Sequence, residues 1–213
     1  FDYAPADLAM LNVPFVCCSY SNRYGTLIEG EYSSVSIADG DTAQQAVEEL
    51  YRHGHRRIAA LISRPNDQSI SQLRYEGYVQ ALESHGIPVD PELVISTGGF
   101  SAKDAYRAVQ EKMAENVDFT ALFAIADSMA IGAMRALMDA GRRIPEDCSV
   151  IAIDGLELSA YIEPPLTTLC QPMEEMGRRS AEILLDMVRH KGSHACELLP
   201  TTLRQGRSVA APR

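Results

Sequence analysis

The sequence lacks the features of a membrane-spanning or nucleic-acid-binding chain. No run of apolar residues approaches the roughly 20 that a helix needs to cross a bilayer. Basic residues are the minority, with 19 Lys and Arg against 29 Asp and Glu, and the net charge is −10. Because proteins hold a phosphate backbone with clustered Lys and Arg, we do not expect this segment to bind DNA by itself.

Cysteine and histidine are too scattered to predict a disulfide framework or a metal site. The cysteines are odd in number, form no C-x-x-C pair and lie mostly within apolar runs; they are Cys17, Cys18, Cys148, Cys170 and Cys196. The five histidines show no ligand spacing either. Buried thiols in a reducing cytosol explain this pattern better than disulfides or zinc. We therefore expect a cytoplasmic protein with no metal and no cofactor.

Catalytic and nucleotide-binding motifs are also missing. The sequence contains no G-x-G-x-x-G after a strand, no G-x-x-x-x-G-K-[ST], no G-x-S-x-G and no H-E-x-x-H. These absences weaken an enzymatic function without excluding one. We predict that the chain is not an enzyme.

What the sequence does have is a regular alternation of apolar runs and amphipathic helices. The chain has 213 residues, of which 46% are hydrophobic and 7% aromatic, enough to bury a core. The predicted strands are 13–20, 34–38, 57–63, 93–96, 121–126, 149–154 and 166–171. Helices are predicted around 43–51, from the capping-box-like Ser101, from Asp127 as the helix cap to Gly141, and over 173–189. Short connections and mostly continuous apolar strands predict an α/β fold with parallel sheets wound on both faces.

Polar residues at the ends of these strands are the candidates for ligand binding, since open α/β sheets bind ligands at the carboxyl ends of their strands. Asp154 ends a predicted strand and is either an Asx-turn residue or an acceptor for vicinal hydroxyls or a ring N–H. Arg74 opens an otherwise apolar helix face in a first turn, where the helix dipole disfavours a cation. A structural ion pair would explain Arg74, but we favour ligand contact because breaks of local rules concentrate at functional sites.

Phe100 is the third candidate. It directly precedes the predicted helix cap Ser101, so it can be a hydrophobic staple onto Ala105. It can also be an aromatic platform against a sugar or base face. The residues alone slightly favour the staple.

Several segments resemble the effector-binding core of the lactose-repressor (LacI/GalR) family in order and spacing. They are 13–16 (VPFV), 54–59 (GHRRIA), 74–78 (RYEGY) with 81–82 (AL), 86–88 (GIP), 127–133 (DSMAIGA), 144–147 (IPED), 164–172 (PPLTTLCQP), and 199–200 (LP) ahead of 207–208 (RS). Together they cover nearly the whole chain. The resemblance implies two α/β subdomains with a periplasmic-binding-protein-like fold, joined by three crossing strands, and a small-molecule effector between them.

The resemblance also implies which residues contact the effector. It places Arg74, Asp154 and Phe100 there, which raises Phe100 above the staple interpretation. Further ligand-binding candidates are Ser19, Tyr20, Gln68, Ala126 and Asp127. The sequence departs from the family pattern at three positions, with Ala126 in place of a common Asn, Asp154-Gly155 in place of a paired acid, and Ser19 in place of an acid. Fewer polar anchors suggest an effector less hydroxylated than a hexose.

The domain organisation follows from the same resemblance. We expect a first subdomain over 1–38 plus 172–196 and a second over 39–171 plus 197–213. The chain begins at Phe1 with no helix-turn-helix, hinge helix or first strands, so we expect that an N-terminal part carrying the DNA-binding domain is absent. The helix from Asp127 is apolar nearly all round, which predicts a homodimer through Ile131, Met134 and Ile162.

Two further functions compete with the repressor hypothesis. A periplasmic sugar-binding protein of a transport system shares the two-lobed fold, but the apolar free cysteines and the 144–147 and 164–168 segments favour a repressor. An enzyme on a doubly wound fold comes third. The leading hypothesis is a sensing and dimerisation domain of a bacterial transcriptional repressor, with a sugar, nucleoside or related metabolite as effector.

Overall fold

A computed structural model describes residues 13–19, 32–64, 69–190 and 194–213. The chain divides into two compact units, each discontinuous in sequence. The first unit contains residues 1–38, 68–70 and 171–201, and the second contains 39–67, 71–170 and 202–213. Within the described ranges, no helix is long and apolar enough to cross a membrane.

The second unit is built on a six-stranded sheet with the strand order β4-β3-β5-β6-β7-β9. The strands are β3 (Ile58–Ile62), β4 (Val94–Ser96), β5 (Ala121–Ala124), β6 (Ser149–Asp154), β7 (Thr167–Cys170) and β9 (Thr202–Arg204). Neighbouring strands are parallel except for the antiparallel pair β7–β9. β3 and β5 are buried at every position, because both faces of the sheet are covered, and this explains their continuous apolar sequences.

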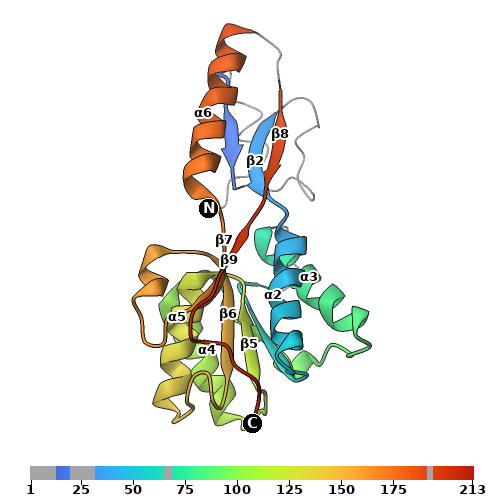
Figure 1. The fold of residues 1–213 in the computed structure, drawn as a ribbon, viewed down its shortest axis with the longest axis vertical. Helices are drawn as coiled ribbons and strands as arrows, with labels where there is room; N and C mark the ends of the chain where they lie inside the picture. Colours follow the sequence, from blue (N-terminus) through green and yellow to red (C-terminus); the bar gives the residue numbers. More distant parts are fainter. Residues whose placement is uncertain (1–12, 20–31, 65–68, 191–193) are drawn as a thin grey trace. The chain divides into compact units, whose positions relative to one another are not determined.

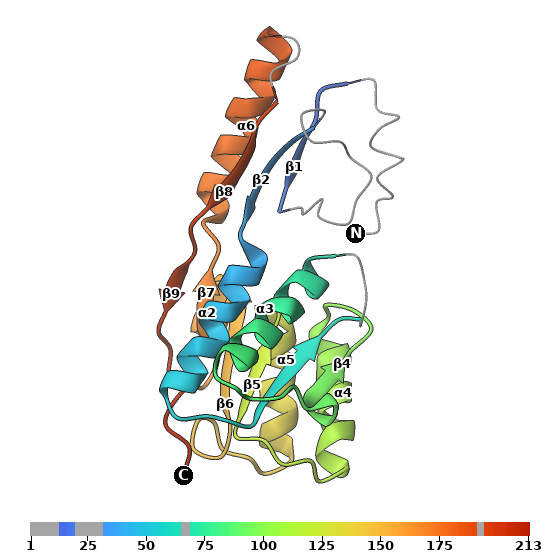
Figure 2. The same cartoon turned by 90° about the vertical axis from the view of Figure 1, so that its right-hand side faces the viewer.

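Helices cover the two faces of this sheet (Figures 1 and 2). Helices α2 (Asp39–Arg52) and α3 (Ile70–Ser84) lie on one face, and α4 (Ala102–Ala114) and α5 (Asp127–Asp139) lie on the other. Short 3-10 turns, η1 (Pro91–Leu93) and η2 (Glu157–Ala160), connect elements. Gly132 lets α5 approach α4, since a Cβ there would lie 2.0 Å from the Ala102 carbonyl oxygen. The predicted fold class, α/β with parallel sheets, is confirmed.

The described part of the first unit has three parallel strands in the order β1-β2-β8. They are β1 (Val16–Cys18), β2 (Ser33–Ile37) and β8 (Cys196–Leu199), and helix α6 (Met173–Arg189) packs against β1 and β2. α6 buries Met176, Ile183 and Met187, and the Ser33 hydroxyl donates to the Met187 sulfur at 3.2 Å. The amphipathic pattern predicted for 173–189 therefore matches the helix and its buried face.

Three details differ from the sequence-based expectations. Residues 197–199 were expected in the second subdomain, but β8 pairs with β2, and the chain leaves the first unit only after Thr201. The strand expected over 13–20 is confined to β1 within the described residues, because Ser19 takes a left-handed φ of 57° that ends it. Asp127 does not cap α5; Ala126 precedes the helix, and the Asp127 carboxylate bonds elsewhere.

His55 ties the amino edge of the second sheet to the C-terminal segment. Its Nε2 lies 2.9 Å from the Ala210 carbonyl oxygen, which only accepts, so Nε2 carries the proton. Nδ1 therefore accepts from the Thr120 hydroxyl, also at 2.9 Å. Burial lowers the pKa of His55 below its ordinary value of 6.5. The folded protein thus holds a neutral imidazole that the unfolded chain protonates more readily.

This arrangement predicts a pH-dependent contribution to stability. The contribution of His55 is fully present above pH 6.5 and decreases as the pH falls towards the lowered folded-state pKa, because the unfolded chain then binds the extra proton. We expect the unfolding free energy of wild type to exceed that of His55→Gln above pH 6.5. Below pH 6.5 this difference should decrease, by at most about 1.4 kcal/mol per pH unit. Urea unfolding of both proteins between pH 5 and 8 measures it. An advantage that grows on acidification would contradict the neutral-imidazole arrangement.

Strand β6 ends in a tight bend against β7. Asp154 and Gly155 both have positive φ angles, 138° and 78°, and Gly155 packs directly on Cys170. A Cβ on Gly155 would lie 2.5 Å from the Cys170 Sγ and 2.7 Å from its Cα. Gly155 is therefore required for its backbone conformation and for the close approach of the two strands.

Gly98 provides a matched control for this requirement. It has a φ of 79°, but a Cβ there would meet nothing within 4 Å. Both Gly155→Ala and Gly98→Ala introduce left-handed strain, and only the former adds a clash. We expect Gly155→Ala to lose about 1–3 kcal/mol more unfolding free energy than Gly98→Ala, measured by urea denaturation. Equal losses would show that the Cys170 contact does not constrain the bend.

Candidate functional site

A buried charged cluster lies at the carboxyl edge of the second sheet. Asp154 ends β6, Ile125 follows β5, Arg74 lies in α3 and Asp39 begins α2. The Arg74 Nε donates to Asp39 Oδ1 at 2.8 Å, and its Nη1 donates to Asp154 Oδ1 at 3.2 Å. Nη1 also donates to the Ile125 carbonyl oxygen. One guanidinium thus joins four elements at the edge where open α/β sheets bind ligands.

The cluster is acidic, because one cation faces two carboxylates. Arg74 and Asp39 are buried, whereas 17% of the Asp154 side chain is exposed. Burial raises the pKa of Asp39 above its ordinary value of 3.8, and the charge of Arg74 opposes this rise. Asp154 is therefore the member of the cluster that can reach a solvent-borne molecule. Its carboxylate can accept hydrogen bonds from hydroxyl or ring N–H groups.

The sequence analysis left two interpretations of Arg74, a structural ion pair and a ligand contact. The alternative of a structural ion pair is realised with Asp39 and Asp154. The same pairing fixes the guanidinium beside the exposed part of Asp154, which leaves ligand contact as a prediction. The positive φ of Asp154 is uncommon for a residue with a side chain, and such strained positions cluster at functional sites.

Asp39 is the residue that the sequence analysis did not select. It follows the buried strand β2 directly after Ala38, so the strand-end rule that selected Asp154 applies to it as well. At the start of a helix, an Asp is ordinarily explained as a capping or dipole-stabilising residue, so the sequence gives no sign of its contact with Arg74.

The carboxylate of Asp127, a predicted ligand-binding residue, is bonded within the second unit. Its side chain is fully buried, and both carboxylate oxygens accept hydrogen bonds within the second unit. The donors are the Leu156 amide at 2.8 Å, the Ser159 hydroxyl at 2.6 Å and the Thr168 hydroxyl at 2.5 Å. Burial raises the pKa of Asp127, and these hydroxyl donors oppose the rise. Both oxygens therefore have partners inside the unit, and a ligand contact of Asp127 stays a prediction.

The other predicted site residues are distributed over both units. Phe100 is 43% exposed beside the Ser101 cap, and its carbonyl oxygen accepts from the Ser128 hydroxyl at 2.8 Å. Ala126 is buried at the start of α5. Ser19 is half-buried at the end of β1 in the first unit. Tyr20 and Gln68 lie outside the described residues.

The residues predicted to form a dimer interface differ in exposure. Met134 is only 1% exposed and packs inside the second unit. Helix α5 packs both on α4 and on strands β5 and β6, which accounts for apolar residues on more than one of its faces. Ile131 and Ile162 are half-buried, while Leu158 and Tyr161, on the turn before Ile162, are 63% and 78% exposed.

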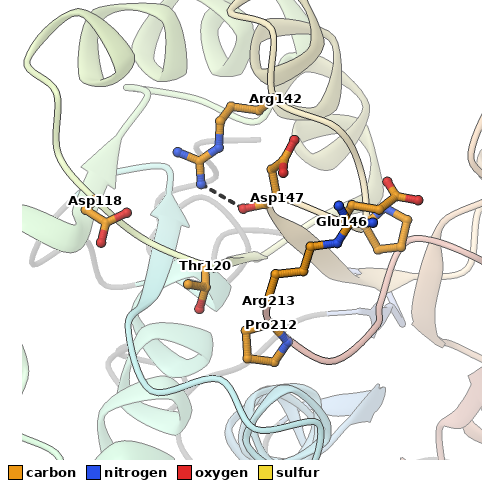
Figure 3. A pocket seen from close by; sticks show the side chains of 8 residues that line it. Asp118, Thr120, Arg142, Glu146, Asp147, Pro212 and Arg213 are labelled. Atoms are coloured by element: carbon orange, nitrogen blue, oxygen red, sulfur yellow. Dashed lines mark hydrogen bonds between the residues drawn. The ribbon is translucent and has the colours of Figure 1, made fainter.

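A pocket of about 330 Å³ lies at the opposite, amino edge of the same sheet (Figure 3). Its lining residues are Asp118, Thr120, Arg142, Pro145, Glu146, Asp147, Pro212 and Arg213. Arg142 donates to the carbonyl oxygens of Phe119 and Asp147, each at 2.8 Å. The mixture of acidic and basic side chains selects no class of ligand. Within the described part of the chain, no group of three or more His, Cys, Asp or Glu residues could hold a metal ion.

Comparison with known proteins places the chain in a family. Residues 47–209 match the periplasmic binding protein-like domain. The HTH-type transcriptional repressor CytR of Escherichia coli (strain K12) is 38% identical over 177 residues, which is 80% of this chain and 51% of CytR. The chain thus spans about half the length of the curated relatives that it matches.

Two solved structures share the fold over nearly the whole chain. The complex of the transcriptional regulator CelR with cellobiose has a TM-score of 0.83 and 34% identity, covering 92% of this chain and 59% of that one. A LacI family transcriptional regulator from Enterococcus faecium with bound ribose has a TM-score of 0.82 and 30% identity, covering 93% and 71%. The resemblance that the sequence motifs indicated is confirmed: this chain belongs to the periplasmic binding protein-like family, in the form found in lactose-repressor-type regulators.

Proposed function

We propose that the chain is the effector-binding and self-associating core of a bacterial transcriptional regulator. The observation that carries this proposal is the cluster of Asp39, Arg74 and Asp154 at the carboxyl edge of the second sheet, with Asp154 strained and partly exposed. The relatives are transcriptional regulators, which favours this function over a transport binding protein or an enzyme.

The chemistry of the cluster favours a small polar effector. Carboxylate oxygens accept from vicinal hydroxyls or ring N–H groups, and the guanidinium donates to ligand oxygens. Sugars, nucleosides and related metabolites carry these groups. Cellobiose and ribose are bound by two of the similar regulators, which is consistent with this class. Phe100, exposed on the same unit, offers an aromatic face for stacking against a ring.

DNA contact belongs, in this proposal, to a part of the protein outside this chain. The net charge of −10 makes the chain a poor partner for phosphates. The relatives are named as helix-turn-helix regulators and are about twice as long as the matched region. The five cysteines are free, which fits a reducing cytoplasm.

Substitution of Asp154 tests the effector site. Asp154→Asn keeps the size and one acceptor oxygen but removes the charge, so we expect a ten- to hundredfold loss of effector affinity, about 1.5–3 kcal/mol. Arg74→Ala is a poorer test, because it leaves Asp39 buried without its partner. Calorimetric titration with the compound that stabilises wild type best gives the measurement. Asp104→Asn, on the exposed first turn of α4, is the control that should bind normally. Unchanged affinity in Asp154→Asn would remove Asp154 from the site.

We also propose that the chain forms a homodimer through the turn before Ile162. Leu158 and Tyr161 expose large apolar surfaces close together in sequence, and Ile131 is a half-buried residue of α5 in the same unit. Contiguous exposed apolar residues are typical of interaction surfaces. This retains Ile131 and Ile162 from the predicted interface, replaces Met134, and adds Leu158 and Tyr161.

A charge introduced into this surface tests self-association. Leu158→Asp and Tyr161→Asp each place a carboxylate where an apolar contact is proposed, and the exposure of both residues protects the fold. We expect at least a tenfold increase in the dimer dissociation constant, measured by sedimentation equilibrium. Val188→Asp, an equally exposed apolar position on α6 of the first unit, is the matched control. A dimer that survives both substitutions and is lost with Val188→Asp would place the interface on α6.

A further inference from the structure

The turn that carries the exposed apolar residues is held from inside by Asp127. The Asp127 Oδ2 accepts from the Leu156 amide and the Ser159 hydroxyl, at 2.8 and 2.6 Å. The Oδ1 accepts from Thr168 in β7 at 2.5 Å. A carboxylate at the start of α5 therefore fixes the beginning of the η2 turn and its distance from the sheet.

A basic residue bonds the same turn next to Asp127. Arg204 of β9 donates to the carbonyl oxygens of Gly155 and Leu156 at 3.4 and 3.1 Å, and also to the Ser159 hydroxyl. Its Nη2 lies 3.9 Å from Asp127 Oδ2. Two neighbouring opposite charges, on two different elements, thus clamp the same turn. Removal of one partner of a largely buried charge pair leaves the other uncompensated, so this clamp has one favoured arrangement.

Asp127 also touches the effector cluster through its backbone. Its amide donates to Asp154 Oδ2 at 3.3 Å, while Asp154 Oδ1 accepts from Arg74. The carboxylate that faces the proposed effector and the carboxylate that clamps the turn therefore belong to one chain of hydrogen bonds. This chain runs from Arg74 through Asp154 and Asp127 to Ser159.

The side of the turn that faces away from Asp127 is exposed to solvent. Ser159 is completely buried and points its hydroxyl at Asp127, whereas its neighbours Leu158 and Tyr161 are the most exposed large apolar residues of the second unit. A small movement of the η2 turn consequently changes the presentation of both apolar side chains.

We propose that Asp127 is a positioning residue that couples the state of the Asp154 carboxylate to the turn over residues 155–161. A ligand hydroxyl that bonds Asp154 competes with the hydrogen bond from the Asp127 amide to Asp154. This competition changes the position of Asp127 and therefore its contacts with the turn. Self-association through Leu158 and Tyr161 and effector binding at Asp154 then shift each other's equilibria by the same factor, as linkage requires. This inference rests on the proposed function, but it can be tested without an effector.

The test needs no effector, because substitution of Asp154 changes the same hydrogen bonds. The protection of the turn is then measured directly. Asp154→Ala removes both acceptors, Asp154→Asn keeps one, and Ser159→Ala breaks the clamp at a buried position that touches neither Asp154 nor solvent. Ser149→Ala is the matched control, because Ser149 is equally buried and bonds Ala210 at the opposite edge of the same sheet. Amide hydrogen exchange over 155–161 and the dimer dissociation constant are measured for each protein, together with global unfolding.

We expect exchange over 155–161 to accelerate about tenfold in Asp154→Ala and Ser159→Ala, less in Asp154→Asn, and not in Ser149→Ala. The dimer dissociation constant should rise at least fivefold in the first two. Combining Asp154→Ala with Ser159→Ala should add little, because both break one chain of bonds. Unchanged exchange over 155–161 in Asp154→Ala, with the protein folded, would overturn the coupling. A monomeric wild type would refute the proposed dimer, and the exchange data would still decide whether Asp154 and the turn are coupled.

Discussion

The interaction on which the second unit depends is the contact of the Arg74 guanidinium with Asp39 and Asp154. A buried guanidinium is costly unless its charge is matched and its donors are bonded. Arg74 meets both conditions with two carboxylates and the Ile125 carbonyl oxygen, and the contacts bring α2, α3 and the ends of β5 and β6 to one point. Asp154 is the partly exposed member of the cluster, so its carboxylate can be reached by a solvent-borne molecule. The bond that stabilises the edge of the sheet is therefore also the bond that orients the proposed effector contact.

The two edges of the same sheet show how differently polar groups are used. At the amino edge, His55 is neutral, buried and bonded through both ring nitrogens, which secures the C-terminal segment. At the carboxyl edge, Asp154 is strained and partly exposed, and its neighbour Gly155 is pressed against Cys170. Saturated hydrogen bonding at one edge and a strained, accessible carboxylate at the other agree with the general position of ligand sites in open α/β sheets.

Sequence patterns predicted the fold well because they depend on local chemistry. Strands buried on both faces show as continuous apolar runs, and α6 shows its buried stripe at helical spacing. The same patterns could not predict contacts between distant residues. The pairing of β8 with β2 depends on where the chain crosses between units, and the burial of Met134 depends on how α4 packs on α5. Asp39, Arg74 and Asp154 were each readable as a polar residue near an element end, but only the folded chain shows which of them meet. Sequence patterns also could not show that the Asp127 carboxylate is buried and bonded to Leu156, Ser159 and Thr168.

The most direct test of the central claim, that the Arg74 cluster binds a small polar effector, is a thermal-shift screen of sugars, nucleosides and purines against wild type and Arg74→Lys. Lysine keeps the charge but loses the planar fork that reaches Asp39 and Asp154 together. A compound present at 100 times its Kd should add about 2.7 kcal/mol to the stability of wild type, and this shift should disappear in the folded Arg74→Lys protein. An equal shift in both proteins would contradict the account by placing the effector elsewhere.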